Sequence, residues 1–321
     1  MFKNYVNLKE YLDNRNARIA NNISRKDLNN SELLLSSFYY WSISHLYRTP
    51  GLSIHRKVAL LYLKLLLNKK IDSDTAYNNI LYPLDTTRYS EFDFMWNALR
   101  NTKFIKYLDV SSPRLLFILL MLRSFESHTH IVNPDKHDLE ATKSMIDLLK
   151  LQDRVTYYNT TTGNLDFRDE HFDAITSMSV IEHMPDNDDT KAVKNMWSWL
   201  RKEGILLISV PCARNGFEEH VNAFDYGLLE KDKNGYVFGQ RFYDEDTLKN
   251  KFFSVIGPPE KYTIYGEIKE GSLYNIRKEK IQDIHYPVWK EPYLIGKTCR
   301  YYRSISELPG WGVISMLFHK R

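Results

Sequence analysis

The sequence FDAITSMSVIEHMPD at residues 172–186, followed by LRKEGILLISVP at 200–211, decides the fold of this chain. The first stretch opens with a run that predicts a buried strand, and the second contains the apolar run 205–210. Between them, residues 191–201 carry apolar side chains at helical spacing. Two buried strands joined by a helix predict a parallel pair with a crossover connection.

The same alternation extends toward the N-terminus. Further strands are expected at 104–110, 129–132 and 154–158, with helices at 115–122 and 138–149 between them. Five strands separated by helices predict an α/β, Rossmann-like doubly wound fold with helices on both faces of a mainly parallel sheet. Ligands of such sheets bind at the carboxyl ends of the strands, where the strand order reverses.

The outer segments differ from this core. Residues 1–100 predict a helical extension, in which an apolar stretch ends at Pro50-Gly51 and a Leu-rich helix, capped by Ser53, runs to Leu67. These helices either pack on the main domain or form a lid or a membrane-surface contact. Residues 101–321 predict the α/β domain, with an insertion at about 213–310. Past the core, a helix is expected at 247–251, and strands at 262–265 and 312–318.

Composition indicates a soluble globular protein. Hydrophobic residues make up 43% and charged residues 26% of the 321 residues, and the net charge of +4 is too small to imply nucleic acid. Two distant cysteines without CxxC spacing, Cys212 and Cys299, predict neither a zinc site nor a disulfide framework. With no signal peptide and no apolar run long enough to span a bilayer, we predict a cytoplasmic protein.

The two opening stretches resemble strand four, its loop, the next helix and strand five of class I methyltransferases that depend on S-adenosylmethionine (SAM). The resemblance covers roughly residues 103–212 and reaches 312–318 more loosely. It implies a seven-stranded sheet whose last strand is antiparallel, and SAM as the cofactor. Residues 83–92, with Pro83-Leu84-Asp85, Arg88-Tyr89 and Glu91-Phe92, are similar to bacterial methyltransferases found with glycan biosynthesis.

The first motif of this family is a strand that ends in an acid, followed by a glycine-rich turn. Asp109 matches the acid, whereas Ser111, Pro113 and Leu115 occupy the three glycine positions. Glycine serves there because backbone approaches the cofactor closely and adopts positive φ. This turn is therefore expected to be built differently.

The remaining cofactor contacts are hypotheses, the first from the residues themselves and the ribose and adenine positions from the resemblance. Ser112 and Pro113 form a good helix start, whose N–H groups, with Arg114, would hold the methionine carboxylate of SAM. Asn133 stands where the family has an acid for the ribose, and Asp135 either reaches the ribose or is only a helix-start residue. Thr161 and Thr162 stand where the family has the acid that binds adenine. Ser177, near the end of strand 172–178, is a further candidate cofactor contact.

A hydroxyl acceptor needs a base, and His is the usual one. His183 follows the strand 172–178, and Glu182 would orient its imidazole, although a structural role for this pair is an equal alternative. His220 is either a second candidate or a solvated loop residue. The acids of 186–189 and 244–246 are interpreted as helix N-terminal residues, and we predict no metal site.

We expect a SAM-dependent O-methyltransferase that acts on a sugar, a glycan precursor or another small polar acceptor. The alternative is a non-catalytic partner or scaffold with the same fold and a degenerate SAM site, favoured by the altered turn and by the missing adenine-site acid. A third hypothesis is that the fold binds another nucleotide-like ligand. The sequence leaves the oligomeric state open, and a peripheral membrane contact is compatible with it.

Overall fold

The computed structural model describes residues 1–10, 12–13, 30–112, 115–123, 127–223, 229–283 and 286–321. The chain forms two compact units. Unit 1 contains Met1–Asp93, Glu218–Gly239 and Tyr265–Gly312, and unit 2 contains Phe94–Phe217, Gln240–Ile264 and Val313–Arg321. The segment expected as one insertion at 213–310 is thus divided between the two units.

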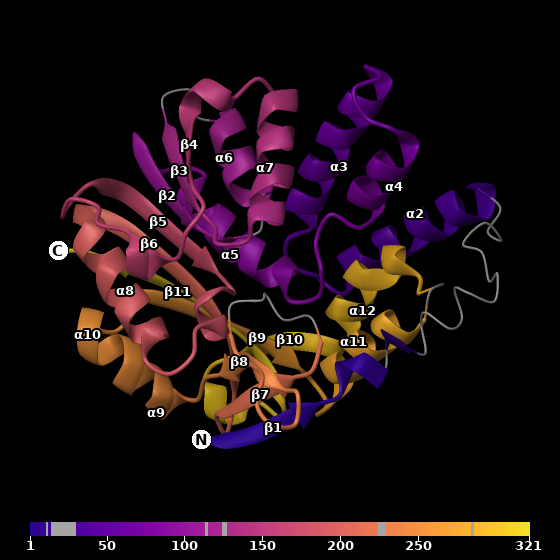
Figure 1. Ribbon diagram of the computed structural model, residues 1–321. Helices are drawn as coiled ribbons and strands as arrows, with labels where there is room; N and C mark the ends of the chain where they lie inside the picture. Colours follow the sequence, from indigo (N-terminus) through magenta and orange to yellow (C-terminus); the bar gives the residue numbers. More distant parts are fainter. Residues whose placement is uncertain (11, 14–29, 113–114, 124–126, 224–228, 284–285) are drawn as a thin grey trace. The chain divides into compact units, whose positions relative to one another are not determined.

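An eight-stranded sheet forms the centre of the α/β fold, as expected from the strand and helix alternation (Figure 1). Its order is β10-β9-β11-β6-β5-β2-β3-β4, and β2 pairs in parallel with β3 and β5. The parallel pairs β3 with β4 and β5 with β6 extend it on either side. The strands are β2 Lys106–Val110, β3 His128–Val132, β4 Val155–Tyr158, β5 Phe172–Met178, β6 Leu200–Ala213, β9 Lys261–Glu267, β10 Cys299–Tyr302 and β11 Trp311–His319.

The last strand runs against its neighbour, as the resemblance implied. The Lys320 N–H donates to the carbonyl of Gly204, and the Glu203 N–H donates to the carbonyl of Lys320, so the end of β11 lies beside the start of β6. The strand β10 is an addition to the seven strands expected. Gly204, which follows the apolar helix pattern of 191–201 and would suit a helix C-cap, lies inside β6 instead, where an added Cβ would meet the Arg201 carbonyl oxygen at 2.8 Å.

Helices cover both faces of this sheet. The helices α6 (Leu115–Arg123) and α7 (Lys136–Leu148) lie on one face, and α8 (Asp188–Trp199) lies on the other (Figure 1). Residues such as Leu108, Ile175 and Leu207 are fully buried between them. A short helical run follows β8, made of α9 (Glu245–Leu248), a π-turn (Lys249–Phe253) and α10 (Ser254–Ile256).

Unit 1 is mainly helical, but its first residues form a strand. The expectation of helix throughout 1–100 is wrong at β1, because Val6 and Leu8 pack with Val221 and Val237 beside a three-stranded sheet of order β1-β7-β8. Its elements are β1 (Phe2–Val6), α2 (Asn30–Leu46), α3 (Leu52–Leu67), α4 (Ser73–Leu81), β7 (Phe217–Val221), β8 (Val237–Phe242), α11 (Ser272–Gln282) and α12 (Glu291–Thr298), with α5 (Arg88–Leu99) at its boundary.

The start of α3 also differs from the expectation. Ser53 lies inside the helix, and Gly51 is the N-cap, with φ at 71°. An added Cβ on Gly51 would come within 2.3 Å of the Tyr89 carbonyl oxygen, so close packing against α5 requires glycine there.

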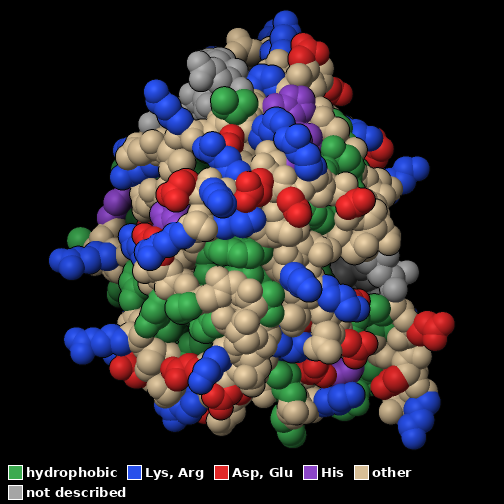
Figure 2. Space-filling view, turned by 90° about the vertical axis from the view of Figure 1, so that its left-hand side faces the viewer, with side chains coloured by type: hydrophobic (Ala, Val, Ile, Leu, Met, Phe, Trp, Pro, Cys, Tyr) green, Lys and Arg blue, Asp and Glu red, His purple; other side chains and the backbone are tan. Residues whose placement is uncertain are grey.

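Among the described residues, no helix has the length and apolar character needed to cross a bilayer. Figure 2 shows one face of the molecule, on which Lys and Arg side chains lie among Asp and Glu side chains. Neither sign of charge forms a continuous field on that face.

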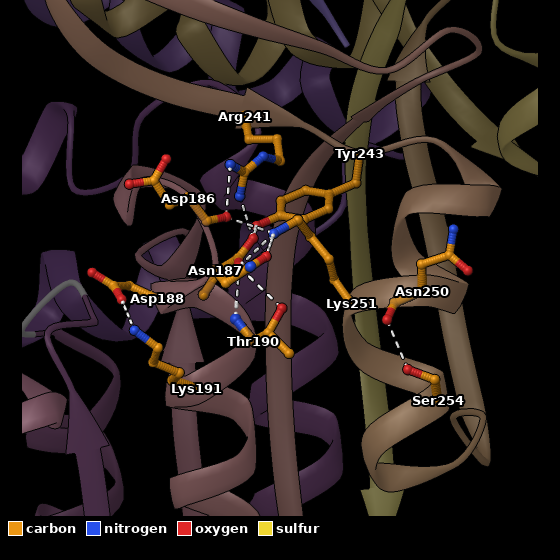
Figure 3. Close-up of polar contacts among 11 residues, drawn as sticks. Asp186, Asn187, Asp188, Thr190, Lys191, Arg241, Tyr243, Asn250, Lys251 and Ser254 are labelled. Carbon is orange, nitrogen blue, oxygen red and sulfur yellow. Dashed lines mark hydrogen bonds and ion pairs between the residues drawn. The ribbon is translucent and has the colours of Figure 1, made fainter.

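A buried ion-pair network fixes the loop that follows β5. The Asp189 side chain, in the first turn of α8, is fully buried. One carboxylate oxygen accepts from the Arg241 guanidinium and from the Tyr243 hydroxyl at 2.9 Å, and the other accepts from Lys251 Nζ at 2.9 Å (Figure 3).

The same two cations also bind the loop backbone. The carbonyl of Asp186 accepts from Arg241 Nη2 at 3.2 Å and from Lys251 Nζ at 2.7 Å. Asp186 itself has φ at 53°, a left-handed conformation that an Asp residue tolerates. Arg241 and Lys251 therefore tie both the buried carboxylate and the end of the loop to β8 and to the helical segment that follows it.

Replacing the buried carboxylate is expected to destabilise unit 2. Asp189→Asn leaves the buried Arg241 without its counter-charge, and we expect the free energy of unfolding to fall by about 3 kcal/mol. Urea unfolding followed by circular dichroism measures this change. Asp188→Asn is the matched control, since its exposed pair with Lys191 predicts a change below about 0.5 kcal/mol. Equal effects of the two substitutions would contradict the role of the network.

A buried histidine in unit 1 predicts loss of stability in mild acid. Burial lowers the pKa of His55 to about 4, and its ring nitrogens contact the Tyr89 hydroxyl at 2.9 Å and the Ile80 carbonyl at 3.0 Å. Between pH 6.5 and 4 the unfolded chain binds a proton that the folded chain excludes, so stability is lost as pH falls. We expect His55 to account for about 2 kcal/mol between pH 7 and 4.5.

The measurement is the free energy of unfolding at both pH values for the native chain and for His55→Gln. The variant should lose less stability on acidification than the native chain. An identical pH dependence would show that His55 is not the group responsible.

Candidate active site

The parallel pairing brings most of the predicted site residues to one edge of the sheet. Asp109 lies in β2 at its carboxyl end, Asn133 directly follows β3, and Thr161 and Thr162 follow β4. The sheet continues from β2 through β3 to β4 on one side and through β5 to β6 on the other, so the strand order reverses between β2 and β5. This is the position at which open α/β sheets bind ligands.

Asp109 organises the turn after β2. One oxygen of its fully buried carboxylate accepts from the Thr176 hydroxyl at 2.8 Å and the Tyr107 hydroxyl at 3.2 Å, and the other accepts from the Ser112 N–H at 3.0 Å. Burial raises the pKa of Asp109 to about 6, although these hydrogen bonds oppose the rise. Both oxygens are thus engaged within the protein.

Serine takes the conformation that the family gives to glycine. Ser111 has φ at 52°, and its N–H and its hydroxyl both donate to the Val132 carbonyl at 2.8 Å. Ser112 is buried, and its hydroxyl oxygen accepts from the Met178 N–H at 3.0 Å, which links the turn to the end of β5. The predicted Pro113 and Arg114 contacts lie outside the described residues.

The ribose candidates hold the start of α7. Asn133 donates to Asp138 at 2.8 Å and accepts from the Asp135 N–H at 2.9 Å. Asp135 is the N-cap of α7, and one of its oxygens accepts from the N–H groups of His137 and Asp138. Asp135 is therefore a helix-start residue in the structure, which was one of the two alternatives for it. Its contact with the ribose stays a prediction.

The adenine candidates follow β4. Thr161 precedes a short 3-10 turn, and Thr162 is buried and accepts through its carbonyl from Asn195 of α8 at 3.4 Å. Ser177, one residue before the end of β5, is fully buried, and its hydroxyl has no hydrogen-bond partner among the described residues.

The two catalytic candidates after β5 share one 3-10 turn, Ile181–His183. Glu182 is buried, whereas the side chain of His183 is 28% exposed. His183 Nε2 lies 3.9 Å from Glu182 Oε1, which is within ion-pair range but too long for a hydrogen bond. Glu182 therefore acts on the imidazole by its charge and not by a hydrogen bond.

His220 belongs to unit 1 and not to the unit that contains His183. It lies in β7, where its ring stacks on Tyr5 with centroids 5.2 Å apart and meets Phe238 edge-on. Burial lowers the pKa of His220, with a further contribution from Lys3. The alternative of a solvated loop residue is wrong, because the ring is packed between aromatic side chains of a sheet.

Sequence analysis missed the residues that hold the loop of His183. It interpreted Asp188 and Asp189 as helix N-terminal acids, and both do lie in the first turn of α8. Asp189 in addition binds Arg241, Tyr243 and Lys251, as described above. No local pattern reports pairs more than 50 positions apart, so only the tertiary structure reveals them.

The turns at the point where the strand order reverses fit a nucleoside-bearing cofactor such as SAM. Ser111 after β2 and Ser179 after β5 both have positive φ, at 52° and 48°, so serine supplies backbone bends that glycine would otherwise provide. The buried, unpartnered hydroxyl of Ser177 lies in the same stretch. Asp109 would contribute mainly by shaping the turn after β2, and Asn133 by shaping the start of α7 after β3.

Comparison with known proteins agrees with this geometry. Residues 108–208 match the family model described as a methyltransferase domain. No curated protein matches the sequence of this chain.

Solved structures resemble the chain at low identity. Geranyl diphosphate C-methyltransferase from Streptomyces coelicolor A3(2) is 10% identical, with 73% of this chain and 78% of that chain covered and a TM-score of 0.46. The [4+2]-cyclase SpnF is 13% identical, with coverages of 71% and 79% and a TM-score of 0.45. Likeness at this level carries no argument about the reaction or the acceptor.

The family match covers Asp109, Asn133 and Ser177, together with the turn of Glu182 and His183. Residues 108–208 are therefore a class I methyltransferase domain, of the class that uses S-adenosylmethionine as its methyl donor.

Proposed function

We propose that this protein transfers a methyl group from SAM to a hydroxyl of a small polar acceptor, and that the acceptor is a sugar or a glycan precursor. The observation that carries the proposal is the convergence of Asp109, Ser111, Ser177 and His183 at the edge where the strand order reverses, inside the matched domain. SAM, when bound, supplies an electrophilic methyl group on a sulfonium. The turns of Ser111 and Ser179 bind and orient it, and Asn133 with Asp135 faces the ribose.

His183 is the proposed base. Its imidazole would take the proton of the acceptor hydroxyl, while SAM would supply the methyl group to that oxygen and be released as the thioether. The neighbouring carboxylate of Glu182, 3.9 Å away, stabilises the imidazolium that forms. Alignment of oxygen, methyl carbon and sulfur contributes most of the rate enhancement, which is why the rigid attachment of this loop through Asp189 matters.

A second candidate function is a non-catalytic partner with the same fold. It is favoured by the internal hydrogen bonds of Asp109 and Asn133, which already satisfy the groups that the family uses for the cofactor. The two functions differ in SAM affinity, which calorimetry measures directly.

We expect the purified full chain to bind SAM and S-adenosylhomocysteine with micromolar affinity, worth about −8 kcal/mol. Titration calorimetry measures both ligands, with adenosine as the control for a site that recognises only the nucleoside. The absence of binding up to millimolar SAM would reject the methyltransferase proposal and favour the partner function.

Substitution of the base should separate catalysis from cofactor binding. His183→Gln is expected to lower the rate of methyl transfer by about 100-fold, because the hydroxyl then keeps its proton, and to leave SAM affinity unchanged. The assay follows radiolabelled methyl transfer to a panel of monosaccharides and nucleotide sugars.

His319→Gln is the control, since His319 pairs with Glu260 at 2.8 Å outside the turn of His183. If both variants keep the full rate on an accepted sugar, His183 is not the base.

A further inference from the structure

The helix α3 exposes a stripe of leucines on the side opposite to its buried face. It buries Ile54, Val58, Tyr62 and Leu65 within unit 1. On the other side, the exposed fractions are 59% for Leu60, 41% for Leu63 and 74% for Leu67. Spacings of three and four residues place these three side chains in one row along the helix. A row of exposed leucines marks a surface that binds another apolar phase.

Cations lie in line with this row and along one side of it. Arg56, Lys57 and Lys64 are exposed on the same side of α3, and Lys69 and Lys70 follow its end. Between residues 33 and 71 the sequence has six Lys and Arg residues and no Asp or Glu, although the whole chain has a net charge of only +4. The surface in Figure 2, by contrast, mixes both signs.

The preceding helix α2 and the loop before α3 also expose apolar and basic side chains. In α2, Leu35, Phe38 and Leu46 are exposed at spacings that also form one row. A hollow of about 330 Å³ at the start of α3 is lined by Trp41, His45, Arg48, Ser53, Arg56 and Asp93, among others. Its two arginines outnumber its one carboxylate, which suits an anionic headgroup.

We propose that the face of α3 formed by Arg56, Lys57, Leu60, Leu63, Lys64 and Leu67 docks on an anionic lipid membrane. Leucines in one row of a helix, with Arg in line with them and Lys beside them, match an interfacial helix, which lies in the plane of the membrane with its apolar side among the acyl chains. With 16 residues, α3 is about 24 Å long and lies along the surface, since it is too short to span the bilayer.

The positive charge of this face favours an anionic membrane over a second copy of the chain as its partner. A two-fold symmetric contact through α3 would bring Arg56, Lys57 and Lys64 of each copy against the same residues of the other, and like charges repel. The anionic leaflet offers the opposite charge, and each Lys or Arg near it contributes about fivefold in affinity. The proposal is independent of the proposed methyl acceptor.

The test is sedimentation of the full chain with large vesicles of phosphatidylcholine mixed with phosphatidylglycerol, compared with phosphatidylcholine alone. We expect binding to the anionic vesicles that weakens as salt is raised, and at least about tenfold weaker binding without the anionic lipid. The charge variant Lys57→Gln/Lys64→Gln and the apolar variant Leu60→Ser/Leu63→Ser/Leu67→Ser should each lose about tenfold or more.

Matched controls carry substitutions of equal type elsewhere on unit 1. Lys231→Gln/Lys233→Gln and Ile268→Ser alter exposed residues outside α3 and should bind as the native chain does. All substituted side chains are exposed, so each variant is expected to fold. Circular dichroism and SAM affinity check that it does.

Three outcomes would overturn the proposal. They are an absence of vesicle binding, equal binding to both lipid compositions, and equal losses in the α3 and control variants. A fourth outcome comes from light scattering after size exclusion, if the native chain is a dimer and the leucine variant is a monomer. That result would assign the leucine face to a second copy.

Discussion

The hydrogen bonds of one buried carboxylate connect the parts of the α/β core on which the site depends. Asp109 and Thr176 are register partners on the parallel strands β2 and β5, so their side chains meet on the same face of the sheet. The Ser112 N–H binds the second oxygen and closes the turn after β2. A carboxylate buried without these donors would cost several kcal/mol, so the strand pair and the turn form together.

A second buried carboxylate, this time paired with cationic side chains, stabilises the loop after β5. Asp189 is buried at the start of α8, where Arg241 reaches it from β8 and Lys251 from the helical segment that follows β8. Both cations also bind the Asp186 carbonyl, so the loop that begins after Met178 is fixed at both ends. The proposed transfer requires a rigid loop, since a displacement of the proposed base by about 1 Å would cost a large part of the rate.

Loss of glycine from the first turn does not remove the turn. Ser111 adopts positive φ at a cost of about 1 kcal/mol, and two hydrogen bonds to Val132 offset this strain. The positive φ that the resemblance implies for glycine is thereby kept, with a hydroxymethyl group in place of a glycine hydrogen. Any cofactor bound here meets a more polar and more crowded turn than a glycine-rich one.

The layered core is predictable from the sequence, because apolar periodicity and strand length are local properties. The segments 172–178 and 191–201 appear as β5 and α8 within a few residues, and the antiparallel final strand is found at Trp311–His319. The order of candidate residues along the sheet edge also follows from strand order alone, since Asp109, Asn133 and Thr161 come at or just after successive strand ends.

Only the tertiary structure decided what each polar side chain does. Local pattern predicted helix at Phe2–Val6, but pairing with β7 and the packing of Val6 with Val221 make it a strand. Asp135 and Asp189 both look like helix-start acids in the sequence, yet the first caps α7 while the second is buried against Arg241. The physical reason is that hydrogen bonds and ion pairs between distant segments depend on which groups folding brings within about 3 Å, and no local sequence pattern encodes that distance.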